Sequence, residues 1–394
     1  MRFRASIHNV NTFTKLTASL ATLNDIAWVK LDNNDVRFTV IPDKGSQVWS
    51  VLSIETIFET YSIQSASQDN AINLKLALPS LLKALKSAQN AVSADIRLTK
   101  KEGKPLLSLT IYAEASSHIN ASRNSFNENN DASNPHNSTP DSHQSREESA
   151  DLFAPRQNRE VVITQDVPVR VIPPATMADT HEPRSREPDV YIHLPNLLQL
   201  KSISDRFTKL AINKTSSSGR STGFATSASP KLELSANMHG VLRLSLNTDA
   251  MRINSQWTGL TNPELDPSQH EDGSQGLANH PSTRMRELGD PQGESEEGWA
   301  VVKVDGKDWG KVLSVGRLNP NRVIACFVDG TALVLYVFLG EEGEGVTESV
   351  LTVRLIEESV GLVPRLMLTY LRSITSRRTV LRGVNLLFCW ERGC

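Results

Sequence analysis

Residues that could carry out catalysis are few in this sequence and poorly placed. Gly219-Arg-Ser-Thr-Gly223 has the G-x-S-x-G spacing that holds a nucleophilic serine, here Ser221, on a tight turn between a strand and a helix. That turn needs an apolar strand before the serine, whereas this motif lies in a polar, serine-rich stretch. Gly340-Glu-Glu-Gly-Glu-Gly345 is rich in glycine, but its glutamates would repel phosphate. We therefore expect no enzyme, with a hydrolase that uses Ser221 as the remote alternative.

Metal chemistry has no better support. The nine histidines show neither His-x-His nor His-x-x-x-His spacing. The three cysteines, Cys326, Cys389 and Cys394, are too few and too badly spaced for a thiolate site or a disulfide framework. Such low cysteine usage is typical of a reducing compartment. We expect no metal ion and no cofactor.

The charge balance limits what the chain can bind. Forty-two Lys and Arg residues face 44 Asp and Glu residues, a net charge of -2, which excludes a protein that holds nucleic acid by bulk positive charge. Local basic surfaces remain compatible with this balance. The sequence contains neither a signal-peptide pattern nor a run of about 18 apolar residues. We expect a soluble intracellular protein that does not bind membranes.

The length of 394 residues predicts more than one domain, because single cores seldom exceed about 250 to 300 residues. Two polar stretches cannot bury enough apolar surface to offset the entropy of ordering, so they are predicted to be disordered insertions. The predicted organisation is an N-terminal domain (1–113), an insertion (114–158), an interdomain connector (159–187), a C-terminal domain (188–355) that contains the second insertion (261–298), and a tail (356–394).

Within each domain, strands and single helices alternate in a repeating order. Apolar residues at Phe13, Leu16, Leu20 and Leu23 have the spacing of an amphipathic helix, which follows a strand at 3–8. Strands are predicted at 26–31, 36–41 and 48–54, and the order restarts with a strand at 72–78, a helix at 80–90 and strands at 95–99 and 106–113.

The second domain repeats this order. Leu78-Pro-Ser-Leu-Leu-Lys83 and Leu194-Pro-Asn-Leu-Leu-Gln199 each join a strand to a helix, with proline near the helix start. Strands are predicted at 231–236, 241–246, 251–260 and 299–304, then a fourth helix at 307–317 and strands at 322–328, 331–339 and 349–355; the loop 215–229 is predicted to be flexible. The sequence thus predicts four units of one strand, one helix and several strands, arranged as two domains.

Each predicted helix has an apolar stripe for a sheet and an opposite face that carries basic residues. The basic residues of the four helices are Lys15; Lys83 and Lys86; Lys201, Arg206 and Lys209; and Lys307 and Lys311, with Arg317 as a further candidate. Lysines on one exposed helix are usually just solvated. Several basic helices that converge on one object would instead suit a phosphate-lined duplex without sequence preference. No helix carries a base-reading set of Arg, Asn and Gln.

Four segments resemble one family. Met1-Arg-Phe-Arg-Ala5, Leu82-Lys-Ala-Leu-Lys-Ser-Ala-Gln-Asn90, Thr164-Gln-Asp-Val-Pro-Val-Arg-Val-Ile-Pro173 and Pro188-Asp-Val-Tyr-Ile-His-Leu-Pro195 are similar to the Hus subunits of the heterotrimeric checkpoint clamp, the 9-1-1 complex, which is related to the sliding clamp PCNA. The similarity runs in order through most of residues 1–355.

The resemblance implies an α+β PCNA-like clamp fold of two similar domains, each made of paired β-α-β-β-β units. The helices then line the inside of a ring, antiparallel sheets lie outside, and the basic residues named above face double-stranded DNA. The implied protein is a non-catalytic nuclear subunit that assembles with two other clamp subunits, is placed on damaged DNA by a clamp loader, and recruits checkpoint and repair proteins. The alternative is an interaction scaffold with this fold that does not contact DNA.

The resemblance also implies which segments meet partners. Subunits of such rings join through edge strands, here predicted at 106–113 (Leu106, Leu109, Ile111) and 251–260 (Ile253, Trp257). The connector residues Val161, Val167, Pro168, Val169, Val171 and Ile172 would border an apolar pocket for partner peptides. The prolines at 168, 173 and 174 have a second interpretation, as stiffeners of a linker.

Two regions lie outside the expected core. Ser268-Gln269 and Ser274-Gln275 look like Ser-Gln sites of checkpoint kinases in the acidic second insertion, although this dipeptide is also common by chance. The insertions resemble a fungal-type elaboration. The tail 356–394 matches nothing in the family pattern. An amphipathic helix for a partner or a membrane surface is one interpretation of it, and a gene-model artefact is the favoured one.

Overall fold

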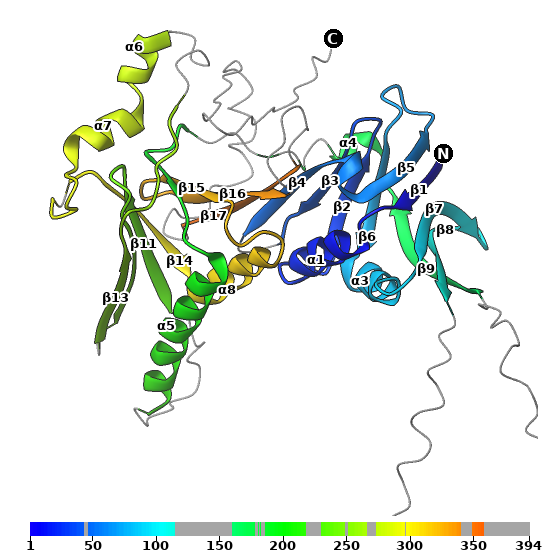
Figure 1. Cartoon of the computed structure of the whole chain (residues 1–394), viewed down its shortest axis with the longest axis horizontal. Helices are drawn as coiled ribbons and strands as arrows, with labels where there is room; N and C mark the ends of the chain where they lie inside the picture. Colours follow the sequence, from blue (N-terminus) through cyan, green and yellow to red (C-terminus); the bar gives the residue numbers. More distant parts are fainter. Residues whose placement is uncertain are drawn as a thin grey trace, which may run out of the picture.

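Two antiparallel sheets form the framework of the described residues, and a row of helices lies along one side of them (Figure 1). The computed structural model describes residues 1–42, 46–114, 160–177, 180, 182, 186–217, 230–248, 251–265, 273–295, 297–339 and 349–357. Among the helices of these ranges, none combines the length and the apolar character that crossing a bilayer requires.

In the described residues, the first domain contains nine strands, two long helices (α1 and α3) and one short helix (α2). Its elements are β1 (Arg2–Ile7), α1 (Val10–Ala21), β2 (Ile26–Leu31), β3 (Asp35–Val40), β4 (Gln47–Ser53), the short α2 (Ile54–Ile57), β5 (Phe58–Gln64), β6 (Ile72–Ala77), α3 (Leu78–Ser87), β7 (Ser93–Lys101), β8 (Lys104–Glu114) and β9 (Glu160–Val171).

The second domain repeats the plan after a short α4 (Pro174–Met177). Its elements are β10 (Val190–His193), α5 (Leu197–Ser217), β11 (Lys231–Asn237), β12 (Leu242–Thr248), β13 (Met251–Trp257), α6 (Gly273–Ala278), α7 (Pro281–Leu288), β14 (Trp299–Asp305), α8 (Gly306–Val312), the 3-10 helix η4 (Leu313–Arg317), β15 (Val323–Val328), β16 (Ala332–Leu339) and β17 (Ser349–Ile356).

One continuous sheet runs through both domains. In the described residues its thirteen strands have the order β10-β15-β16-β17-β4-β3-β2-β6-β9-β8-β7-β1-β5, and a second sheet has the order β13-β12-β11-β14. The domains join where β17 pairs with β4, with Leu351 opposite Ser50. Strand β9 pairs with β8 over 160–168 and with β6 over 169–171, so it links the two halves of the first domain. The predicted antiparallel sheets, with helices between their strands in a repeated order, are confirmed.

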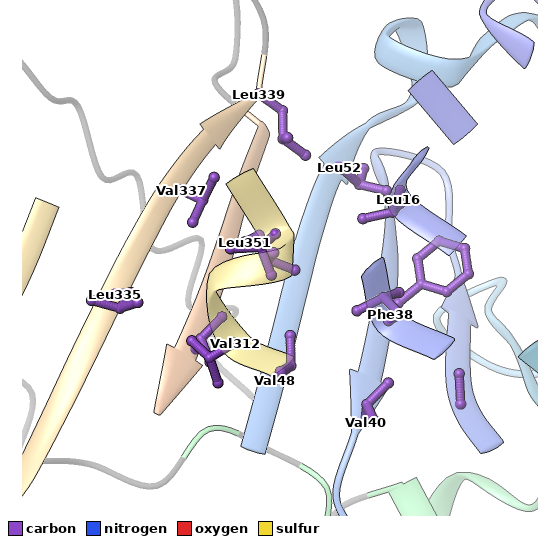
Figure 2. Packing of buried hydrophobic residues seen from close by; sticks show 14 of the residues in the cluster. Leu16, Phe38, Val40, Val48, Leu52, Val312, Leu335, Val337, Leu339 and Leu351 are labelled. Atoms are coloured by element: carbon purple, nitrogen blue, oxygen red, sulfur yellow. The ribbon is translucent and has the colours of Figure 1, made fainter. Parts of the chain in front are cut away.

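The core is equally continuous across the domain junction. Figure 2 shows Leu16 of α1 near Leu52 of β4, and Val48 of β4 near Leu351 of β17 and Val312 of α8. These side chains are at most 1% exposed. Because one apolar cluster spans both domains, neither domain can separate from the other without exposing it to water.

Two strands were missed by the sequence analysis. Strand β5, which pairs with the whole of β1, lies where no element was predicted. Strand β9 occupies the first half of the predicted connector, so the connector is limited to the residues between β9 and β10. Val167 and Val169 alternate with Pro168 and Arg170 in a period of two, and they are buried while their neighbours are exposed. The prolines concealed this strand pattern.

The second insertion, predicted to be disordered, is ordered in much of its length. It contains α6 and α7, and its first residues cover the outer edge of β10. The amide Nδ2–H of Asn262 donates to the carbonyl of Tyr191 (2.6 Å), and the N–H of His193 donates to the carbonyl of Thr261 (2.8 Å). His280 is 2% exposed and its ring Nδ1 caps α7 by accepting from the N–H of Ser282 (3.2 Å). The prediction of disorder is therefore wrong for these residues.

Other predictions fall outside the described residues. They concern 115–159 of the first insertion, 218–229 of the predicted loop with Ser221, the glycine-rich stretch 340–348, and 358–394 of the tail. The first residues of the tail do belong to the fold: Ile356 ends β17, and the N–H of Glu357 donates to the carbonyl of Thr331 (2.9 Å).

Candidate nucleic-acid interface

Four helices form a continuous row on one side of the sheets in the described structure. The row runs from α3 to α1, then to η4 and α8, and ends at α5, with each helix in contact with the next (Figure 1). The two domains contribute equally to it, because each supplies two helices. The row is the surface that the sequence analysis assigned to DNA.

Helix α1 is placed by a cap and an apolar stripe. The side chain of Asn9 accepts from the N–H of Thr12 (2.9 Å), which satisfies one free donor of the first turn. Phe13, Leu16 and Leu20 are buried against the sheet. Lys15 lies between them in sequence and is exposed, so it points away from the sheet as predicted.

Helix α3 presents two lysines. Pro79 lies in the first turn, where its missing N–H costs nothing, and Leu81 and Leu85 are buried. Lys83 and Lys86 are exposed one turn apart. Together with Pro79, Leu82 and Ser87 they line a shallow hollow on the helix surface. Two ammonium groups beside a hydroxyl give this hollow the donors that a phosphate needs.

Helices α5 and α8 are connected through Lys201, one of the residues predicted to contact DNA. Lys201 is only partly exposed, and its ammonium donates to the carbonyl of Gly310 (2.8 Å) and lies 3.2 Å from the carboxylate of Asp205. Arg206 and Lys209 are exposed on the same helix. Lys201 therefore bridges two helices and offers less free charge than the sequence suggested.

Helix α8 is capped by Asp305, whose carboxylate accepts from the N–H groups of Lys307 (2.8 Å) and Asp308 (3.0 Å). Lys307 and Lys311 are exposed, with Lys311 3.1 Å from the Asp308 carboxylate. The predicted helix at 307–317 is an α-helix only to Val312 and continues as the 3-10 turn η4. Arg317, at the end of this turn, is a further exposed cation.

The row is strongly basic although the whole chain is not. Helices α1 and α3 contain no acidic residue, and the acids Asp205 and Asp308 of α5 and α8 are each paired with a lysine. The exposed cations of the row are Lys15, Lys83, Lys86, Arg206, Lys209, Lys307, Lys311 and Arg317. Flexible cations on helix faces can bind phosphates along a duplex without reading its bases.

One of the two predicted sheet edges differs from the observed one. Strand β8 has β7 on one side and β9 on the other, and Leu109 and Ile111 on it are buried, so the expected free edge at Leu106, Leu109 and Ile111 is wrong. Residues 160–168 of β9 have a described neighbour only in β8, and they provide the open edge instead.

The second predicted edge is at the end of its sheet. Strand β13 pairs only with β12 in the described residues. Its side chains Ile253 and Trp257 pack partly against the core, so any contact there would use the backbone and the opposite-facing side chains.

The residues assigned to a connector pocket lie in β9 or directly after it. Val167, Val169 and Ile172 are buried and Pro168 is exposed; Val171 is half-buried. Val161, with Val162 and Ile163, is exposed on the open edge. Because Val167, Val169 and Ile172 belong to the core, Val161, Pro168 and Val171 are the members of this set with surface to offer, and the pocket for partner peptides stays a prediction.

No other site emerges from the described residues. Within them, no group of three His, Cys, Asp or Glu side chains is arranged to hold a metal ion. Cys326 is buried, and burial raises the pKa of its thiol. Ser274 lies in α6, whereas Ser268 lies outside the described residues.

Comparison with known proteins identifies the family. The family model described as Hus1-like protein matches residues 1–355, which is all of the chain up to the penultimate residue of β17. The chain belongs to the Hus1-like family. The checkpoint protein hus1 of Schizosaccharomyces pombe is 34% identical over 340 residues, covering 86% of this chain and 93% of the relative. The checkpoint protein HUS1 of Homo sapiens is 27% identical over 281 residues, covering 69% of this chain and 79% of the relative.

A solved structure agrees at the level of fold. The Proliferating Cellular Nuclear Antigen of Entamoeba histolytica has a TM-score of 0.51 and 12% identity, covering 90% of this chain and 98% of its own. At this identity the likeness concerns the fold alone. The family match ends at residue 355, so most of the tail lies outside it.

Proposed function

We propose that this chain is a non-catalytic subunit of a heterotrimeric checkpoint clamp that encircles double-stranded DNA at sites of damage. The observation that carries the proposal is the continuous row of basic helices on one side of a two-domain clamp fold. A duplex carries about one negative charge per 1.7 Å of axis, so a long basic surface matches it at many points at once. Such contacts provide affinity without sequence specificity.

In a closed ring, each subunit contacts its two neighbours through two different surfaces. The open edges of β9 and β13 meet this need because they belong to different domains and lie toward opposite sides of the molecule (Figure 1). Exposed valine and isoleucine side chains at 161–163 make the β9 edge a favourable place for strand addition. We infer that two other clamp subunits pair with these edges.

The remaining roles follow from membership of such a ring. A closed ring needs a clamp loader to open it on DNA, and its outer face can recruit repair and checkpoint proteins. The site of action would be the nucleus. Phosphorylation of Ser268 and Ser274 is a further proposal, and it is supported only by their Ser-Gln dipeptides in an acidic insertion.

An interaction scaffold that does not contact DNA is the second candidate. It is favoured by Lys201 and Lys311, whose charges are partly satisfied by acids of their own helices. The two candidates differ in whether the other exposed cations of the row have a function.

The assembly part of the proposal is tested by co-expression of the full chain with the two companion clamp subunits and measurement of mass by light scattering. A complex with one copy of each chain is expected. A stable monomer or a homotrimer would mean that only the fold is shared with the clamps. A homotrimer would additionally require the β9 edge of one copy to pair with the β13 edge of the next.

A further inference from the structure

The sheet face opposite the helix row carries two arginines in an unfavourable arrangement. Arg4 of β1 and Arg97 of β7 are direct partners in the antiparallel pairing of the two strands. Both are exposed, and the side chain of Arg4 is 76% exposed. Like charges that lie directly opposite each other destabilise a sheet.

The direction of these arginines follows from the alternation along each strand. Phe3 and Ala5 of β1 and Ile96 of β7 are buried in the core, so Arg4 and Arg97 lie on the outer face. Arg2 shares this face because it stands two residues before Arg4, and it is also exposed. The outer face therefore gathers three guanidinium groups within two neighbouring strands.

One carboxylate lies among them. Asp95 accepts a hydrogen bond from the hydroxyl of Ser6 (2.7 Å) and lies 3.7 Å from the guanidinium of Arg4. Within the described ranges, neither Arg2 nor Arg97 has an ion pair. A single carboxylate, already engaged by a hydroxyl, leaves most of the positive charge unbalanced.

One neighbouring strand adds a hydroxyl group in the same row. Ser62 of β5 is the partner of Arg4 and is exposed. Ser108 of β8 is the partner of Arg97 but is only 2% exposed, so it offers no hydroxyl at the surface. With strands about 4.8 Å apart, the two arginines stand at a spacing that one tetrahedral anion can bridge.

We propose that this arginine row, defined as Arg2, Arg4 and Arg97, binds a phosphorylated segment of a partner protein, with one phosphate held between Arg4 and Arg97. A phosphate group carries about 1.5 to 2 negative charges and can accept bidentate hydrogen bonds from both guanidiniums. A carboxylate carries only one charge and would leave the pair half balanced. Phe3, Ala5 and Ile96, which alternate with the row along each strand, are buried in the core, so the row lies on the face opposite the helices and this binding is independent of DNA held by the helix row.

The experiment measures fluorescence anisotropy of short labelled peptides with the full chain. The probes are an acidic peptide with two phosphoserines, the same peptide with serine in their place, the same peptide with glutamate in their place, and a short DNA duplex. The phosphopeptide is expected to bind at least about tenfold more tightly than either control peptide. Arg4→Gln with Arg97→Gln should remove that preference, and Arg284→Gln with Arg286→Gln, the same change at two exposed arginines of α7, should keep it.

Melting temperatures show whether the double variant is folded. Since the substitution removes like-charge repulsion, the variant without peptide should melt at the same or a higher temperature than the parent. The phosphopeptide should raise the melting temperature of the parent and leave that of the variant unchanged. Equal binding of the glutamate peptide, or no binding of the phosphopeptide, would overturn the proposal. Loss of duplex binding in the double variant without any peptide preference would overturn it as well, by assigning the row to nucleic acid.

Discussion

The indole Nε1–H of Trp309 donates a hydrogen bond of 3.0 Å to the hydroxyl of Ser204, and this bond joins α8 to α5 inside the second domain. The indole is completely buried, and the Ser204 hydroxyl in turn donates to the carbonyl of Leu200 (2.8 Å). This buried contact, together with the bond from Lys201 to the carbonyl of Gly310, therefore fixes the relative position of the two helices and of the cations they carry.

Truncation at this contact should destabilise the chain. Ser204→Ala leaves the buried indole N–H without an acceptor, and we expect a loss of about 1 to 3 kcal/mol in the free energy of unfolding. Trp309→Ala also leaves a cavity and should cost about 3 to 5 kcal/mol. Urea unfolding checks both values, with Ser202→Ala at an exposed position of α5 as the control. Unchanged midpoints for both variants would contradict the geometry.

Charge reversal on the helix row should weaken DNA binding and leave the fold intact. Lys83→Glu with Lys86→Glu removes two exposed cations of α3 and adds two anions, so duplex affinity of the assembled clamp should fall at least about tenfold and its salt dependence should become shallower. The matched control is Lys100→Glu with Lys104→Glu, at exposed lysines of the β7–β8 hairpin. Equal losses in both variants would remove the special role of the helix row.

Lys201 should behave differently from these lysines. Because its ammonium bridges α5 to the carbonyl of Gly310, Lys201→Met should lower the free energy of unfolding by about 1 kcal/mol. The same substitution at Lys86, which is exposed, should change stability by less than about 0.5 kcal/mol. Denaturant midpoints of the two variants separate the structural lysine from the surface lysine, and similar values for both would be against this assignment.

Substitution on the β9 edge should block assembly. Val161→Lys with Ile163→Lys places two charges on an open strand edge, and lysine on an edge disfavours pairing with another strand. Association with the companion subunit should weaken at least about tenfold while the isolated chain keeps its melting temperature. Val92→Lys, at a side chain 70% exposed outside the edge, is the control. Normal ring formation by the double variant would exclude β9 as an interface.

Stability should also respond to pH through Glu182. Burial raises the pKa of this carboxyl from 4.5 to about 7, and the nearby Arg354 opposes the shift without cancelling it. The folded state therefore binds the proton more tightly than the unfolded chain, so the contribution of Glu182 is favourable below about pH 4.5 and is lost as the pH rises toward 7. Glu182→Gln should flatten this part of the pH profile and stabilise the chain at pH 8. A profile identical to that of the parent would contradict the burial of this group.

Most of the architecture could be predicted from the sequence because its elements obey simple periods. The stripe that contains Phe13, Leu16 and Leu20 marked α1, and the repeated Leu-Pro segments marked the starts of α3 and α5. The exposure of Lys83, Lys86, Arg206 and Lys209 followed from the same helical spacing.

What could not be predicted depends on partners distant in the sequence. Strand β9 pairs with β8 across a long insertion, and the sequence does not show which residues pair. The prolines of β9 therefore favoured a linker rather than a strand. The second insertion is held by side chains that cap backbone groups, such as Asn262 on the carbonyl of Tyr191 and Asp290 on the N–H of Glu294 (2.9 Å). The polar composition of the insertion predicted disorder, because composition does not show which backbone groups these side chains bind.

Encirclement of DNA is tested most directly by loading the assembled clamp, with this chain labelled, onto closed circular DNA and then cutting the circle. The account predicts that the label stays on intact circles through a high-salt wash and leaves when the DNA is linearised, because a ring slides off free ends. Equal retention on circular and linear DNA, or equal loss from both, would contradict a ring that holds DNA within its row of helices.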